Sequence, residues 1–169
     1  MGAQLVPQLA DVGVRENQGL KYTAWRYSTP LLGKLDRLPP PSGINYIATG
    51  VLTQQTNGQP MIEPAPGYTS FDLKSLRFGC IANVQSANGV PQTCTILVSG
   101  VQKSGKFVSQ TLIFNPNPLP QASQFGSQTF DPAEFKNLIK VNFGLVQRVL
   151  PEILSVIVLD NVSYRAYQC

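Results

Sequence analysis

The side chains that could do chemistry in this 169-residue chain are few, and none of them is a histidine. Nucleophilic serine and cysteine sites use histidine as the base, and most zinc sites use it as a ligand. We therefore expect a protein that is not an enzyme. A pair of carboxylates could still hydrolyse a glycosidic bond, but the acidic residues are scattered and no pair is singled out by its spacing.

Three cysteines are present, Cys80, Cys94 and Cys169, and no two of them have the CxxC spacing of zinc or redox motifs. Cys80 and Cys94 flank a turn-like stretch at 86–89, so their sulfurs can meet if the flanks pair as a hairpin. We predict a disulfide between them, with two buried free thiols as the alternative. In the chain-entropy model, a disulfide that closes a loop of this length stabilises a fold by about 3 kcal/mol. Cys169 is then left over, either free or cross-linked to a second chain.

Aromatic and amide side chains occur together in and beside the loop-rich stretches. Sugar recognition uses flat aromatic faces that stack on C–H groups, with amides and carboxylates that reach hydroxyls. The candidates for such a ligand-binding site are Trp25, Tyr27, Asn45, Tyr46 and Tyr68. The alternative for Trp25 is a place in the core, whereas Tyr46 and Tyr68 are the better surface candidates.

Two carboxylates, Asp72 and Asp160, are expected at strand edges, where carboxylate and backbone oxygens could hold a structural calcium ion. The alternative is that Asp160 and Asn161 cap backbone groups at the start of a strand. No cofactor other than calcium is expected. Asn161 also begins an Asn-Val-Ser sequon, which makes it a candidate for N-glycosylation.

Charge is scarce, since only 13% of the residues are charged and the net charge is +4. The 13 lysines and arginines are scattered, and phosphate binding requires clustered positive charge. We therefore expect no nucleic-acid partner, while a weak attraction to acidic polysaccharide stays open. The longest apolar stretch, around 153–159, is far too short to span a membrane, so no membrane partner is expected.

Alternating hydrophobic residues indicate seven to nine short strands separated by turns rich in glycine and proline. The clearest strands are predicted at 22–27, 44–52, 76–84, 93–101, 107–114, 139–143 and 154–167, and the main loops at 38–43, 53–67 and 115–120. This pattern predicts an all-β fold, an antiparallel β-sandwich or jelly roll. Residues 1–20 lack periodicity and are expected to form an extended or partly ordered lead-in, followed by a single domain at 21–169.

One short helical turn is predicted near 132–138. Asp131 is a suitable N-cap, Pro132 suits the first helical position, and Glu134 completes a capping-box pattern. Phe130 and Phe135 occupy the positions of a hydrophobic staple.

Three stretches together resemble fungal secreted proteins with a galactose-binding-like jelly roll: Ser70–Cys80, Cys94–Gly100 and Val158–Tyr164. The resemblance implies a β-sandwich, secretion and contact with carbohydrate. We therefore expect a secreted, extracellular, non-catalytic module whose partner is a cell-wall polysaccharide or another glycan. The alternative is a secreted structural or effector-like host-interaction protein, which displays loops on the sandwich and has a host or cell-wall protein as its partner.

Overall fold

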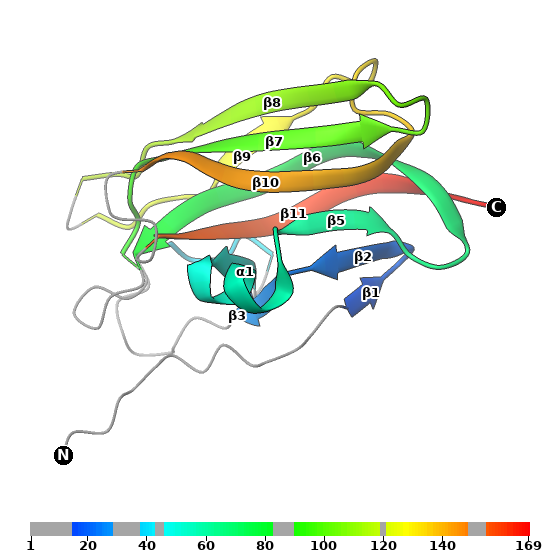
Figure 1. The fold of residues 1–169 in the computed structure, drawn as a ribbon. Helices are drawn as coiled ribbons and strands as arrows, with labels where there is room; N and C mark the ends of the chain where they lie inside the picture. Colours follow the sequence, from blue (N-terminus) through cyan, green and yellow to red (C-terminus); the bar gives the residue numbers. More distant parts are fainter. Residues whose placement is uncertain (1–14, 29–37, 43–45, 83–89, 119–120, 149–154) are drawn as a thin grey trace.

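The computed structural model describes residues 15–28, 38–42, 46–82, 90–118, 121–148 and 155–169 (Figure 1). Within these ranges the chain forms eleven strands and one short helix. In chain order they are β1 (Arg15–Asn17), β2 (Leu20–Thr23), β3 (Arg26–Ser28), β4 (Tyr46–Gly50), α1 (Val51–Asn57), β5 (Met61–Pro64), β6 (Tyr68–Ala82), β7 (Cys94–Gln102), β8 (Phe107–Phe114), β9 (Gly126–Thr129), β10 (Leu138–Arg148) and β11 (Ser155–Gln168).

The strands form two layers that meet at one corner (Figure 1). The β6–β11 sheet has the order β9-β6-β11-β4-β3, and the β7–β10 sheet has the order β1-β2-β5-β10-β7-β8. The two sheets join where Leu138 of β10 lies opposite Phe71 of β6. Every strand pair is antiparallel, so the predicted antiparallel β-sandwich is confirmed.

The core lies between the sheets, and its residues follow the predicted alternation. On β7 every second residue from Cys94 to Gln102 is buried. On β6 the buried face runs through Phe71 and Leu73 and then continues at Leu76, so the alternation shifts by one position. Register shifts in the pairing of β6 with β11 occur in the same region, as expected for a β-bulge. The bulge lets one long strand keep its apolar residues in the core on both sides of the kink.

The helix α1 corrects the sequence prediction, which continued a strand to residue 52 and placed a loop at 53–67. The helix ends at Gly58, which has φ 81° and donates its N–H to the carbonyl of Gln54 at 2.8 Å. A glycine in this position is a common helix C-cap. The pair Asn57-Gly58 was interpreted as a loop turn because the same two residues suit both structures. Strand β5 also lies within the predicted loop.

The predicted helical turn near 132–138 is present as a single hydrogen-bonded turn. Asp131 caps it, because its Oδ1 accepts the N–H of Ala133 at 2.8 Å and its carbonyl accepts the N–H of Phe135 at 2.8 Å. The rings of Phe130 and Phe135 lie 4.6 Å apart, which confirms the staple. Glu134 has a different role from the one predicted: its carboxylate forms an ion pair with Lys106 at 2.9 Å.

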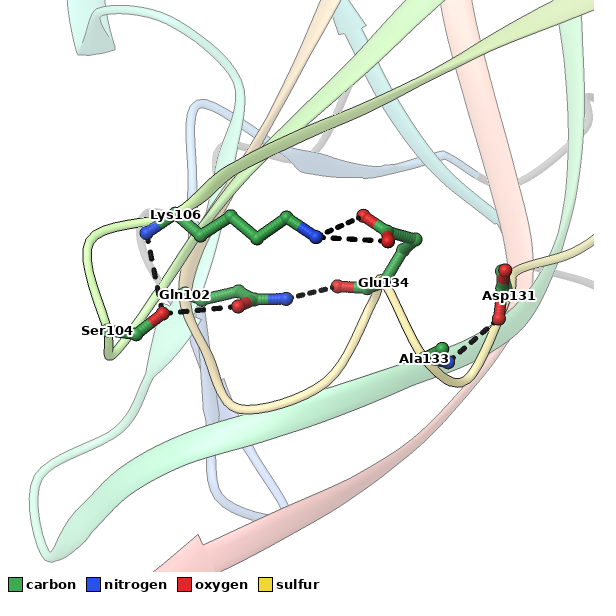
Figure 2. Close-up of polar contacts among 6 residues, drawn as sticks. All are labelled: Gln102, Ser104, Lys106, Asp131, Ala133 and Glu134. Atoms are coloured by element: carbon green, nitrogen blue, oxygen red, sulfur yellow. Dashed lines mark hydrogen bonds and ion pairs between the residues drawn. The ribbon is translucent and has the colours of Figure 1, made fainter.

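Figure 2 shows how this turn is fastened to the β7–β8 hairpin. The side-chain amide of Gln102 donates to the carbonyl of Glu134 at 2.6 Å, and its Oε1 accepts the hydroxyl of Ser104 at 3.2 Å. Gln102 is buried, so its hydrogen bonds contribute more than the exposed ion pair between Lys106 and Glu134. Together these contacts hold in place the segment that connects β9 in one sheet to β10 in the other.

Cys80 and Cys94 form the predicted disulfide, with their Cα atoms 6.2 Å apart. The flanks of the predicted turn pair antiparallel, as expected: Ala82 donates its N–H to the carbonyl of Val90 at 2.8 Å, and Gln92 donates its N–H to the carbonyl of Cys80 at 3.0 Å. An isolated antiparallel bridge between Ile81 and Pro91 lies between these two hydrogen bonds, just before β7 begins. The expected strand partner was wrong, however, because β7 pairs with β8 and β10 and not with β6. The predicted turn at 86–89 lies outside the described residues. Cys169 is an exposed free thiol.

The first described residues already belong to a sheet. β1 pairs with β2 through a two-residue turn, Gln18-Gly19, in which φ is 48° and 91°. Two positive φ values are typical of the turns that close tight hairpins. The expected lead-in therefore contributes an edge hairpin from Arg15 onward, and residues 1–14 lie outside the described ranges. Among the described residues, no helix is long and apolar enough to cross a membrane.

Candidate functional site

Two of the five predicted sugar-binding residues lie in the core. Trp25 is 4% exposed and its ring meets Phe143 edge to face, with the centroids 5.3 Å apart. Tyr46 is 5% exposed and packs against Phe125 with the centroids 6.0 Å apart. Neither ring can present a face to a ligand at the surface. The core alternative therefore holds for Trp25, and the choice of Tyr46 as a surface candidate is corrected.

Tyr68 is the predicted candidate whose side chain the structure shows to be accessible, as it is half-exposed at the start of β6. Its ring lies against the β1–β2 turn, where a Cβ atom on Gly19 would come within 2.7 Å of it. Gln168 donates to the Tyr68 hydroxyl at 3.4 Å, and Tyr164 donates to the carbonyl of Gln18 at 3.2 Å. The side chain of Tyr27 and the whole of Asn45 lie outside the described residues.

The outer face of the β6–β11 sheet carries a cluster that sequence analysis found only in part. Asp72 on β6 lies opposite Arg165 on β11, and the Tyr167 hydroxyl donates to Asp72 Oδ2 at 2.6 Å. The Arg165 guanidinium lies over the Tyr167 ring, 5.4 Å from its centroid. The second Asp72 oxygen accepts the N–H of Asn137 at 2.8 Å. Asp72, Arg165 and Tyr167 are called the Arg–Tyr–Asp cluster below.

The strands explain why these three side chains share a face. Val162, Tyr164 and Ala166 pack toward the core, so the alternation of β11 directs Arg165 and Tyr167 outward. The signal was available in the predicted alternation of the last strand. The sequence prediction instead placed the ligand site at aromatic residues near the loops.

The cluster combines the groups that recognise polar ligands. Arg165 is exposed, and a guanidinium presents five N–H donors in a rigid plane. Stacking on the Tyr167 ring holds that plane in position through a cation–π contact. The Asp72 carboxylate adds acceptor oxygens. Together they can bind hydroxyl or carboxylate groups of a ligand that lies across the sheet.

Hydroxyl side chains continue this surface across neighbouring strands. Ser75 lies opposite Thr129 of β9 on one side and Ser163 of β11 on the other, and Arg77 lies opposite Ser127. Directly opposed residues in antiparallel strands point to the same face. Since Leu76 between Ser75 and Arg77 is buried in the core, these polar side chains face outward. The cluster thus lies at one end of an extended polar sheet face.

The two predicted calcium ligands do not come together. Asp160 of β11 lies opposite Arg77 of β6, and Asp72 lies five positions before Arg77 on the same strand. Asp72 and Asp160 are therefore separated by about 16 Å along the strand direction. Asp160 is buried, and its carboxylate accepts the N–H of Ser42 at 2.9 Å, the hydroxyl of Ser42 and the N–H of Asn161 at 2.7 Å. The capping alternative thus describes Asp160. No group of three potential metal-ligating residues occurs within the described ranges.

Asn161 occupies the bulge of β11 with φ 47° and is exposed. Its side chain is therefore accessible, and its N-glycosylation stays a prediction.

Burial and hydrogen bonding shift the pKa values of two tyrosine side chains in this region. The hydrogen bond to Asp72, followed by desolvation and the charge of that carboxylate, raises the pKa of Tyr167 above its ordinary value. Desolvation and the neighbouring Tyr68 raise the pKa of Tyr164. Both shifts mean that the folded protein favours the protonated phenol.

The raised pKa of Tyr167 predicts a pH effect on stability. Its stabilising contribution is fully present below about pH 10, the ordinary tyrosine pKa, and is lost as the pH rises through the folded-state pKa. We expect the free energy of unfolding of Tyr167→Phe to fall less steeply above pH 10 than that of the wild type. Urea unfolding between pH 8 and pH 11, taken as approximate limits, measures this difference. Parallel curves for the two proteins would contradict the assigned hydrogen bond.

Comparison with known proteins supports the fold. No family model matches this chain, and no curated protein matches it. A solved structure of a DUF4465 family protein from Bacteroides caccae ATCC 43185 is similar, with a TM-score of 0.54 and 13% identity over 89% of this chain and 80% of that chain. This likeness supports the β-sandwich architecture. The structure of an exo-beta-agarase gives a TM-score of 0.41 and 9% identity over 98% of this chain and 25% of that one.

Proposed function

We propose that this chain is a secreted, non-catalytic module that binds cell-wall polysaccharide through the outer face of its β6–β11 sheet. The observation that carries the proposal is the Arg–Tyr–Asp cluster, in which Arg165 is stacked over Tyr167 while the Tyr167 hydroxyl is bonded to Asp72. An exposed guanidinium held over an aromatic ring is a fixed donor surface, because the stacking limits its motion before a ligand arrives.

The surroundings of the cluster favour a long polar ligand. The hydroxyls of Ser75, Thr129 and Ser163 form a row across three strands beside it. Such a row offers donors and acceptors at the strand spacing of about 4.8 Å. A polymer with repeated hydroxyl groups can meet several of these positions at once, which compensates for weak individual contacts.

The positive net charge of +4 further favours polymers that carry carboxylates. Arg77 and Arg165 both lie on this face, and guanidinium groups bind carboxylates in a bidentate manner. Among cell-wall polysaccharides, a pectin-like polymer therefore fits the face better than a neutral glucan.

The disulfide supports the proposal of secretion. Disulfides form and persist in oxidising compartments and are rare in the cytosol. Cys80 and Cys94 are buried and bonded within the core, so this bond belongs to the folded structure and is not a surface redox pair.

Binding to insoluble polymers tests the proposed function. Wild-type protein, Arg165→Ala and Tyr167→Ala would be mixed with cellulose, chitin, β-glucan, mannan and pectin, and the bound fraction measured. We expect retention on pectin that each variant weakens by about tenfold or more, since hydrogen bonds to charged groups contribute about 1.5–3 kcal/mol. Lys140→Ala, which removes an exposed positive charge from β10 in the other sheet, is the matched control and should bind as the wild type does.

Two results would overturn this proposal: no retention of the wild type on any polymer, or equal retention of wild type and Arg165→Ala. Retention on a neutral polymer, lost in Arg165→Ala, would support the site and overturn the preference for carboxylates. Each variant is first checked for folding by its urea midpoint, so that loss of binding is not confused with loss of structure.

A further inference from the structure

Strand β8 forms one edge of the β7–β10 sheet. Within the described residues it pairs with β7 alone, and Figure 1 shows it at the outer border of its layer. An edge strand presents unpaired backbone N–H and C=O groups, which proteins usually protect with charged residues, prolines or bulges. The eight residues Phe107–Phe114 contain no charge, no proline and no glycine. This edge is therefore available for pairing with another strand once the side-chain amide of Gln110 leaves the carbonyl of Thr111, to which it donates at 3.1 Å.

The exposed side chains of β8 are unusually apolar. Phe107 is 80% exposed and Ile113 is 63% exposed. Ser109 and Thr111 lie between them and are exposed on the same face, while Val108 and Leu112 are buried on the other. The strand thus has an apolar residue at each end of its outer face and hydroxyls in the middle.

We propose that β8 pairs with β8 of a second copy of this chain, antiparallel about a two-fold axis that passes through Gln110. In this register Phe107 of one copy lies opposite Ile113 of the other, Ser109 lies opposite Thr111, and Val108 lies opposite Leu112. Each outward residue meets an outward residue, and each inward residue meets an inward one. The β7–β10 sheets of the two copies become one continuous sheet.

The strand is complementary to itself in this register because its outer residues are arranged symmetrically about Gln110. Pairing places Phe107 against Ile113 twice, once on each side of the axis. It thereby removes from water the two large apolar side chains that are most exposed among the residues the structure describes. A slip of one residue would oppose exposed Phe107 to buried Phe114 and place every side chain on the wrong face. Prolines at 116 and 118 end the strand and limit the pairing to this segment.

Substituting charged residues at the paired positions tests the proposal. The experiments use Cys169→Ser as the background, so that disulfide-linked dimers do not contribute. We expect sedimentation equilibrium to show a reversible dimer, and Ser109→Lys/Thr111→Lys to weaken it by about tenfold or more, because like charges then face each other on both sides of the axis. Ser109→Glu/Thr111→Glu should do the same alone, and an equal mixture of the two variants should dimerise again. Ser99→Lys, on the same face of the inner strand β7, is the control.

Cysteine cross-linking tests the register. Opposed residues of antiparallel strands have Cα atoms about 4.5–5.5 Å apart, which a disulfide can bridge. Gln110→Cys on the proposed axis should give a cross-linked dimer on oxidation, whereas Thr111→Cys should not. A wild type that remains monomeric at every concentration, or a mixture of the charged variants that fails to dimerise, would overturn the proposal. Cross-linking through Thr111→Cys in place of Gln110→Cys would overturn this pairing.

Discussion

Replacing both Cys80 and Cys94 with alanine is expected to lower the free energy of unfolding by about 3 kcal/mol, with a range of roughly 2–5 kcal/mol. The two residues are 14 positions apart, and opening a loop of that size restores freedom to the unfolded chain. The bond also crosses the core and ties β6 in one sheet to β7 in the other. The chain that leads into β7 is otherwise tied to β6 by backbone pairing such as the isolated bridge between Ile81 and Pro91.

Urea unfolding measures the loss as a lower midpoint. The wild type with its disulfide reduced should unfold near the midpoint of the double alanine variant, because both lack the same cross-link. Cys169→Ala, which removes the exposed free thiol, is the control and should leave the midpoint unchanged. An unchanged midpoint in the double variant would show that the sheets are held together without the bond.

The strands with strict alternation were predictable because their information is local. In β7 and β8 each side chain faces either core or solvent, and the period of two is visible in any short window of sequence. The architecture then followed from the number of strands and the turns between them. By contrast, the strand beside which each strand lies depends on contacts between distant residues. The pairing expected between strands β6 and β7 was therefore wrong, although the chain beside the two cysteines does pair, at residues 80–82 and 90–92, and the disulfide was right.

The missed helix has a local cause of a different kind. Asn57-Gly58 suits a tight turn and a helix C-cap equally well, because both need a residue with positive φ. Packing against the rest of the protein decides between them, and the sequence pattern does not record it.

The candidate site was predictable in part. Asp72 was selected for its charge at a strand edge, but Arg165 and Tyr167 became visible only when β11 was placed beside β6. Their juxtaposition is a property of the register, which is set by bulges near Asn161 and in β6. Such bulges change which residues face each other, and no single motif marks them.

Trp25→Ala is expected to lower the free energy of unfolding by about 3–5 kcal/mol, the usual cost of removing a large aromatic ring from a core. The ring is 4% exposed and meets Phe143 edge to face, so its removal opens a cavity between the N-terminal strands and β10. Urea unfolding of the purified variant measures this loss.

Trp25→Phe is the matched variant, and it separates the two hypotheses for this residue. The Nε1–H of Trp25 is buried and has no hydrogen-bond partner among the described residues. Phenylalanine removes that unsatisfied donor while it keeps most of the ring, so we expect a loss of about 1 kcal/mol or less. Polysaccharide binding by folded Trp25→Phe should equal that of the wild type, because the ring is buried and packs against Phe143. A variant of full stability that had lost binding would instead make Trp25 part of the ligand site and would contradict its place in the core.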